Sequence, residues 1–304
     1  MARRAKWAVI LVIHAVAVVA ALAAACTDDD KRWQGGDADT DTDTDADTDG
    51  DGDSDDDSCR LVDVVISVDA SSSMVEEHAA LRNDVFPAFA ANLGEIGQGL
   101  DNFRVATLEA CPNPANFHTR GASTGECGFT SGEVWIDSSY DNMDAEFACV
   151  GDIYLDDMLC SGMDDDEQPV TAMLTALNPP WSENQNAGFL RDDALLVVIA
   201  MTDEDEQPTV GDAFTAEEIF SAVAALKGGD PKKVVFLGVG GSATCTGLYG
   251  TVDAPATKLK AITDLFSAQE RGIWWDLCGG QPMEDGLDAA FAIIDQACDE
   301  FVIE

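Results

Sequence analysis

"DVVISVDASSSM", residues 63–74, is a run of apolar, mostly β-branched residues that ends in one aspartate and three consecutive serines. The apolar part begins at residue 61 and extends to residue 68. Continuously apolar runs without strict alternation are typical of parallel strands that are covered on both faces of a sheet. "ALLVVIAM" (194–201) and "KVVFLGVG" (233–240) have the same character. The three runs therefore predict the central strands of a parallel sheet.

Further strands and several helices are predicted around this centre. Less regular runs indicate strands over 102–110 and 272–277, and an edge strand over 132–138. Apolar residues recur at helical spacing in five segments, 74–93, 167–177, 215–227, 254–268 and 283–298, and Pro87 is expected to bend or restart the first of these helices. Strands that alternate with helices predict an α/β fold, a doubly wound, mostly parallel open sheet of the Rossmann-like kind flanked by helices.

Oxygen-bearing side chains follow two of the predicted central strands. Asp69, Ser71 and Ser73 follow the first strand, and Asp203, in "TDED", follows the run 194–201. Ligands of open α/β sheets bind at the carboxyl ends of strands, so we expect both groups to face one crevice. Oxygen-only ligands favour a hard cation, Mg²⁺, Ca²⁺ or Mn²⁺. A serine-rich helix N-cap is the alternative for the first group, but the matching position of Asp203 favours metal. The acids at 204–206 are interpreted as a solvated loop.

"DASSSM", placed directly after an apolar first strand, resembles the D-x-S-x-S signature of the von Willebrand factor A family, and "TDED" resembles that family's second aspartate motif. The resemblance spans residues 60 to about 300. It implies a metal-ion-dependent adhesion site, in which Ser71 and Ser73 ligate the cation through their hydroxyls and Asp69 and Asp203 act directly or through water. Because hydroxyl ligands are neutral, the cation would keep positive charge and an open position for a carboxylate of a protein partner.

One element departs from the family pattern. The family normally adds a threonine from a loop just before a middle helix. In the corresponding stretch, "GMDDDEQPVTAM" (162–173), Glu167 or Gln168 falls near the expected place and Thr171 lies further into the helix. Glu167 is therefore the candidate that replaces the threonine. A carboxylate from Asp166 or Glu167 would make the metal less electrophilic and could close the site.

Enzymatic alternatives lack required residues. A Mg²⁺-dependent phosphotransfer enzyme with Asp69 as nucleophile requires a second carboxylate two residues later and a basic residue for the phosphate. Ser71 occupies that position, and no basic residue accompanies either loop. A serine hydrolase requires a histidine; His78 lies five residues after Ser73, but its neighbours predict a helix face in solvent, and no G-x-S-x-G is present. We therefore expect a protein that is not an enzyme.

The amino-terminal segment predicts export. Basic residues precede an uncharged apolar run over 7–25 that ends in "LAAAC", which is typical of a secretory signal over residues 1–25. Cys26 resembles the lipidated cysteine of bacterial lipoproteins, although Ala23 stands where leucine is usual. We expect a lipid anchor at Cys26 that holds the protein on the cell envelope, at the outer membrane or cell surface. An uncleaved transmembrane anchor is the alternative.

A repetitive acidic segment follows. "DADTDTDTDADTDGDGDSDDDS" (37–58) offers nothing to bury and repels itself, so residues 26–58 are predicted to be a disordered, extended linker. The register from Asp45 to Asp56 also fits the oxygen spacing of a calcium loop. No helical pattern flanks that register, so the linker is favoured. Residues 59–304 then form one domain.

Charge and cysteine content restrict partners and compartment. A formal net charge of −42 repels nucleic acid, so nucleic-acid binding is excluded. Nine cysteines less Cys26 leave an even set, which predicts up to four disulfides in an exported chain, and the absence of a CxxC pair argues against zinc. Four of these cysteines lie between 111 and 160, in a Gly-, Asn- and Ser-rich stretch. We interpret about 111–165 as a disulfide-pinned surface excursion near the carboxyl ends of the strands.

These features predict a membrane-anchored, extracytoplasmic protein that binds a protein partner through a divalent cation. The first alternative is a structural envelope lipoprotein, in which the metal site is absent or only stabilises the fold. The phosphotransfer enzyme is the second alternative.

Overall fold

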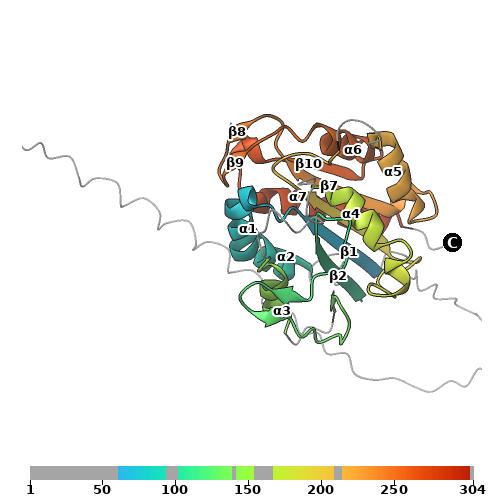
Figure 1. Ribbon diagram of the computed structural model, residues 1–304. Helices are drawn as coiled ribbons and strands as arrows, with labels where there is room; N and C mark the ends of the chain where they lie inside the picture. The colour runs from blue at the N-terminus through green and yellow to red at the C-terminus, as the bar shows by residue number, and fades with distance from the viewer. Residues whose placement is uncertain (1–60, 94–101, 139–141, 154–166, 209–213, 302–304) are drawn as a thin grey trace, which may run out of the picture. The chain divides into compact units, whose positions relative to one another are not determined.

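The predicted strands form one sheet in the computed structural model, which describes residues 61–93, 102–138, 142–153, 167–208 and 214–301 (Figure 1). Six strands lie in the order β10-β7-β6-β1-β2-β5. Every neighbouring pair is parallel except β2 and β5, which are antiparallel. The bounds are β1 Leu61–Val68, β2 Asn102–Glu109, β5 Ile136–Asp137, β6 Leu195–Met201, β7 Val234–Gly240 and β10 Gly272–Asp276. The predicted fold class is confirmed.

Several predictions fall on other parts of the chain. The signal segment 1–25, the lipidation of Cys26, and the linker 26–58 with its candidate calcium loop lie outside the described residues. Among the residues that the structure describes, no helix is both long enough and apolar enough to cross a membrane.

The chain order reverses between β1 and β6. The chain runs from β1 to β2 on one side, and later returns to place β6 on the other side of β1. Val68 and Met201 are partners at the ends of the two strands, and the Asp69 backbone N–H donates to the Met201 carbonyl at 2.9 Å. This is a topological switch point, where ligands bind in open α/β sheets. The sheet therefore carries the Asp69 and Asp203 loops to one place.

Helices cover both faces of the sheet (Figure 1). One face packs against α1 Val75–Ala80, α2 Phe86–Leu93, α3 Met143–Val150 and α7 Met283–Asp299, and the other against α4 Pro169–Ala176, α5 Ala216–Ala225 and α6 Thr257–Ser267. Alternate residues of β1 divide between the two cores: Val64 and Ile66 enter the first, and Val65 enters the second. Because both faces are buried, the central strands are predominantly apolar, and the two polar residues of β1, Asp63 and Ser67, are buried as well.

The first predicted helix is interrupted where its proline suggests. α1 passes into a wider π-helical turn over Leu81–Val85, and α2 begins at Phe86, one residue before Pro87. A proline lacks the backbone N–H that a continuous helix would use, so the turn before it adjusts.

The cysteine-rich excursion is pinned by a disulfide, as predicted, but it also contributes to the cores. Cys127 bonds to Cys149, which ties the short hairpin of β3 Arg120–Gly121 and β4 Gly125–Glu126 to α3. The predicted edge strand is present as β5, whereas α3 was not expected from the sequence. A second disulfide, Cys245–Cys278, links the hairpin of β8 Cys245–Thr246 and β9 Thr251–Val252 to the segment after β10. Cys111 and Cys298 each take part in a disulfide as well.

The start of α5 offers a test of the local structure. The Thr215 hydroxyl accepts from the Glu218 backbone N–H at 3.2 Å, and the Glu218 carboxylate accepts from the Thr215 backbone N–H at 2.8 Å. We expect Thr215→Ala to lower the free energy of unfolding by about 1 kcal/mol, because the cap of α5 is lost. Urea denaturation measures the change. Ser221→Ala, at an exposed position of the same helix, is the control; an equal loss in the control would contradict the capping role.

Candidate functional site

Asp69 braces the loop that follows β1. The residue is fully buried, and both carboxylate oxygens accept internal hydrogen bonds: Oδ1 from the Ser71 backbone N–H at 2.7 Å and Oδ2 from the Thr202 hydroxyl at 2.8 Å. The first bond fixes the backbone that presents the serines. The second ties this loop to the residue that precedes Asp203.

The two predicted loops meet through their side chains. Ser71 Oγ lies 2.8 Å from Ser73 Oγ, and the Ser73 hydroxyl donates to Asp203 Oδ1 at 3.2 Å. Ser73 and Asp203 are 130 positions apart in the sequence, so only the sheet topology brings them together. The structure thus places Asp69, Ser71, Ser73 and Asp203 in one cluster, which we call the serine cluster. Their role as metal ligands stays a prediction.

Carboxylates accumulate around the serine cluster, and in the described part of the chain no basic side chain is among the main influences on Asp203 or Glu77. Burial, and then the nearby charge of Asp69, raise the pKa of Asp203 to about 7. Burial also raises the pKa of Glu77 to about 8, with a contribution from the charges of Asp203, Glu76 and Asp69. Burial raises the pKa of Asp69 as well. The sequence did not single out Glu77, which lies on α1 beside the serine cluster.

The donor set fits a hard cation in its chemistry. Asp203 Oδ2 and Glu77 Oε2 are buried and have no hydrogen-bond partner within the described part of the chain. Buried polar groups normally have a partner, so these two oxygens call for one. Every side chain of the cluster offers oxygen, which suits Mg²⁺, Ca²⁺ or Mn²⁺. No group of three or more His, Cys, Asp or Glu side chains in the described ranges is placed to hold a metal, so hydroxyls would have to supply ligands.

Glu167 reaches the same end of the sheet through its backbone. The Gln207 backbone N–H donates to the Glu167 carbonyl at 2.8 Å, and the next residue, Gln168, donates to the Ala110 carbonyl at 2.8 Å, just after β2. The Glu167 side chain is buried. Its role as a metal ligand stays a prediction. Thr171, which lies further into α4, donates its hydroxyl to Glu206 Oε1 at 2.6 Å.

The prediction of a solvated acidic loop after Asp203 was wrong for two of its three acids. Asp205 is buried, and its Oδ1 accepts from the Lys258 and Leu259 backbone N–H groups at 2.9 and 3.0 Å, at the start of α6. Glu206 is fully buried and binds the start of α4: its oxygens accept from the Val170 backbone N–H at 2.7 Å and the Thr171 backbone N–H at 2.9 Å. Both carboxylates satisfy helix N–H groups that have no partner within their helices.

The interpretation of His78 as solvent-facing was also wrong. His78 is buried, and its Nε2 lies 2.6 Å from the Asp69 carbonyl. His78 therefore supports the loop after β1 through its contact with the main-chain carbonyl of Asp69. Burial lowers the pKa of its imidazole, which favours the neutral ring.

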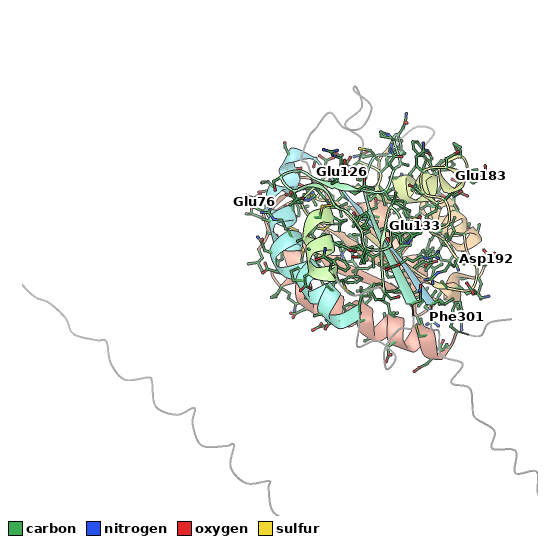
Figure 2. All side chains as sticks on the ribbon, turned by 90° about the horizontal axis from the view of Figure 1, so that it is seen from below. Glu76, Glu126, Glu133, Glu183, Asp192 and Phe301 are labelled. Carbon is green, nitrogen blue, oxygen red and sulfur yellow. A yellow bond between two sulfur atoms is a disulfide. The ribbon has the colours of Figure 1, made fainter. Side chains whose placement is uncertain are left out.

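The serine cluster lies at the carboxyl end of the sheet. Glu76, on the first turn of α1 beside the cluster, lies far from Asp192, which precedes β6 at the other end of the sheet (Figure 2). The loops that follow β1 and β6 thus lie together at one end of the sheet.

Comparisons with known proteins add only distant structural likenesses. No protein-family model and no curated protein matches the chain. A crystal structure of proximal thread matrix protein 1 from the mussel byssus (crystal form 2) is 15% identical with a TM-score of 0.41, over 79% of this chain and 49% of that one. Manganese-loaded TRAP protein of Plasmodium vivax is 14% identical with a TM-score of 0.36, over 79% of this chain and 74% of that one. This chain spans about half the length of the mussel protein, and similarity at this level carries no conclusion about function.

Proposed function

We propose that this protein is a non-enzymatic, extracytoplasmic binding protein that captures a carboxylate of a protein partner through a divalent cation at the serine cluster. The observation that carries the proposal is the contact between Ser73 and Asp203, which joins loops 130 positions apart at the switch point of the sheet. Asp69, Ser71, Ser73 and Asp203 would hold the cation, with Glu167 as a further candidate. Mg²⁺, Ca²⁺ and Mn²⁺ all suit these oxygens.

The chain's own residues would position the ligands before any cation arrives. Asp69 fixes the turn through the Ser71 backbone N–H, and the paired hydroxyls of Ser71 and Ser73 lie side by side. A bound cation would supply positive charge that neutral hydroxyls do not cancel, which favours an incoming carboxylate. The excess of buried acid around Asp203 disfavours binding of an anion without that cation.

The surroundings of the cluster support protein binding. Val75, directly after the cluster, is 51% exposed, and Leu248, in the β8–β9 turn, is 58% exposed. This turn approaches Glu76 and Glu77 at Gly250. A protein partner bound at the cluster would cover these two exposed apolar side chains.

The geometry gives no support to the enzymatic alternatives. Both oxygens of Asp69 accept internal hydrogen bonds, which does not favour a nucleophile. His78 contacts the main chain of Asp69 and is not hydrogen-bonded to a serine hydroxyl in the described structure, so no serine–histidine pair is in place.

The location of the protein is part of the proposal. Disulfides such as Cys127–Cys149 and Cys245–Cys278 are typical of chains that fold outside the reducing cytoplasm. We propose that a lipid on Cys26 anchors the chain to the envelope, at the outer membrane or cell surface, and that residues 26–58 act as an extended acidic tether between the anchor and the binding domain.

Peptide selection tests the proposed function. A random peptide library is selected on the immobilised protein in Mn²⁺ and eluted with chelator. We expect the eluted peptides to contain Asp or Glu and to fail to bind the Ser71→Ala, Ser73→Ala double variant. Peptides that bind equally well in chelator and to the double variant would contradict the proposal.

The structural alternative predicts a different outcome. If a cation only stabilises the fold, Mn²⁺ raises the melting temperature but no chelator-sensitive peptide is recovered. The buried carboxylates of Glu77 and Glu167 motivate this alternative, because added acid makes a bound cation less attractive to a further carboxylate.

A further inference from the structure

Three consecutive residues, 205–207, anchor the loop that carries Asp203. The carboxylates of the first two bind the starts of α6 and α4, and the third donates its backbone N–H to the Glu167 carbonyl at 2.8 Å. Glu206, the middle residue, is fully buried, so solvent water does not compete for its hydrogen bonds. The position of Asp203 is therefore set by contacts that begin only two residues further along the chain.

Glu206 joins two segments that the proposed cation site requires. Its Oε1 accepts from the Thr171 backbone N–H at 2.9 Å and from the Thr171 hydroxyl at 2.6 Å. Thr171 lies four positions after Glu167, and Asp203 lies three positions before Glu206. The same carboxylate therefore fixes the Asp203 loop against the segment that presents Glu167. Its hydrogen bonds within the described ranges go to α4, so Glu206 acts on the serine cluster indirectly.

The oxygens of the serine cluster are spaced like the ligands of a small cation. Ser71 Oγ lies 2.8 Å from Ser73 Oγ, which lies 3.2 Å from Asp203 Oδ1. Six oxygens arranged octahedrally at about 2.1 Å from Mg²⁺ lie about 3.0 Å from their neighbours. The corresponding spacing around a six-coordinate Ca²⁺, with ligands at about 2.4 Å, is about 3.4 Å. The cluster therefore matches the smaller ion and would have to widen for a six-coordinate Ca²⁺.

We propose that Glu206 is a positioning residue of the cation site: it holds Asp203 at its distance from the serine hydroxyls and thereby makes the site prefer Mg²⁺ to Ca²⁺. This inference rests on the proposed function, because it concerns the same cation. Mg²⁺ demands near-octahedral geometry, whereas Ca²⁺ accepts six to eight oxygens in flexible geometry. A loop that is free to shift therefore weakens the binding of Mg²⁺ more than that of Ca²⁺. The choice between the two ions thus depends on a residue that is not a ligand.

Calorimetric titration of the chelator-treated protein with Mg²⁺ and, separately, with Ca²⁺ tests this role, at about pH 8, above the pKa of about 7 that burial gives the Glu206 carboxyl. We expect the ratio of Mg²⁺ to Ca²⁺ affinity to fall about 10-fold in Glu206→Gln, because an amide nitrogen cannot accept hydrogen bonds. Thr171→Val, which removes the hydroxyl that Glu206 binds, should lower the ratio by a smaller factor. Thr175→Val is the matched control: its hydroxyl donates to the Thr171 carbonyl within α4, at 2.8 Å.

The outcomes separate this inference from the proposed function. A purely structural role of Glu206 would leave the ratio unchanged, because a general loss of stability does not distinguish two ions. If Glu206→Gln and Thr171→Val keep the ratio, if Thr175→Val lowers it as much as Thr171→Val, or if the unmodified protein prefers Ca²⁺, the positioning role is wrong while the proposed function stands. If the Ser71→Ala, Ser73→Ala variant binds both ions like the unmodified protein, the proposed function fails and this inference fails with it.

Discussion

Replacing Ser71 and Ser73 together with alanine is expected to weaken Mg²⁺ binding at the serine cluster about 100-fold, or about 2.7 kcal/mol. The two hydroxyls lie 2.8 Å apart and face Asp203, so their removal takes away two neutral oxygens from one place. Interactions of hydroxyls with charged groups contribute about 1.5–3 kcal/mol each. The remaining carboxylates of Asp69 and Asp203 would retain weak binding. Isothermal titration calorimetry of the chelator-treated protein with Mg²⁺ measures the loss.

The loop contains its own control. Ser72 lies between the two serines and is exposed, so Ser72→Ala changes the same segment without removing either hydroxyl of the cluster. We expect its Mg²⁺ affinity to stay within about threefold of the unmodified protein, the range that small surface changes produce. An unchanged affinity in the double variant, or an equal loss in Ser72→Ala, would show that the hydroxyls are not ligands.

Glu206→Ala is expected to lower the free energy of unfolding by about 3 kcal/mol. The substitution leaves the Val170 and Thr171 backbone N–H groups and the Thr171 hydroxyl without their acceptor, at the buried start of α4. Because Asp203 lies three residues before Glu206, its loop would also lose its attachment to α4. Urea denaturation measures the loss, and Glu217→Ala, at an exposed position of α5, is the control. A loss below about 1 kcal/mol would contradict the role of Glu206 as acceptor for the start of α4.

The Glu206 carboxyl is also expected to make the free energy of unfolding fall as the pH rises. Burial raises the pKa of Glu206 to about 7 in the folded protein, above its ordinary value of 4.5. The folded protein therefore favours the protonated Glu206 carboxyl. The stability that comes from this preference is fully present below pH 4.5 and is lost as the pH rises through 7. Compared with Glu206→Gln, the unmodified protein should lose about 2 kcal/mol of stability between pH 5 and pH 8. Parallel curves for the two proteins would show that Glu206 does not titrate in this range.

The sheet and the serine cluster were predictable because both depend on short-range patterns. The run 61–68 becomes β1 without a change of bounds, and the strands predicted at 194–201 and 233–240 each begin one residue later than expected. Buried parallel strands must be apolar on both faces, which makes them visible as runs. Residues that follow neighbouring parallel strands come together at one edge, so Asp69 and Asp203 could be paired from their positions alone.

The remaining features depend on contacts that no local pattern records. Asp205 and Glu206 sit in an acidic stretch that looks solvated, yet they cap helices whose starts lie 53 and 36 positions away. Glu77 is buried beside Asp203 and Gly250, and His78 is buried against the Asp69 carbonyl, and the local sequence records neither contact. Helix α3 was missed because its eight residues, Met143–Val150, lie in a stretch rich in turn-forming residues, and Phe147 anchors it through tertiary packing. Sequence periodicity over so short a segment is weak.

The most direct measurement is a crystal structure of the protein grown in Mn²⁺, with the ion located by its anomalous scattering. We expect one anomalous peak bounded by the Ser71 and Ser73 hydroxyls and the Asp203 carboxylate, with oxygens within about 2.5 Å of the ion. Crystals that show well-ordered Ser71, Ser73 and Asp203 side chains but no anomalous peak between them would contradict the proposed cation-dependent function.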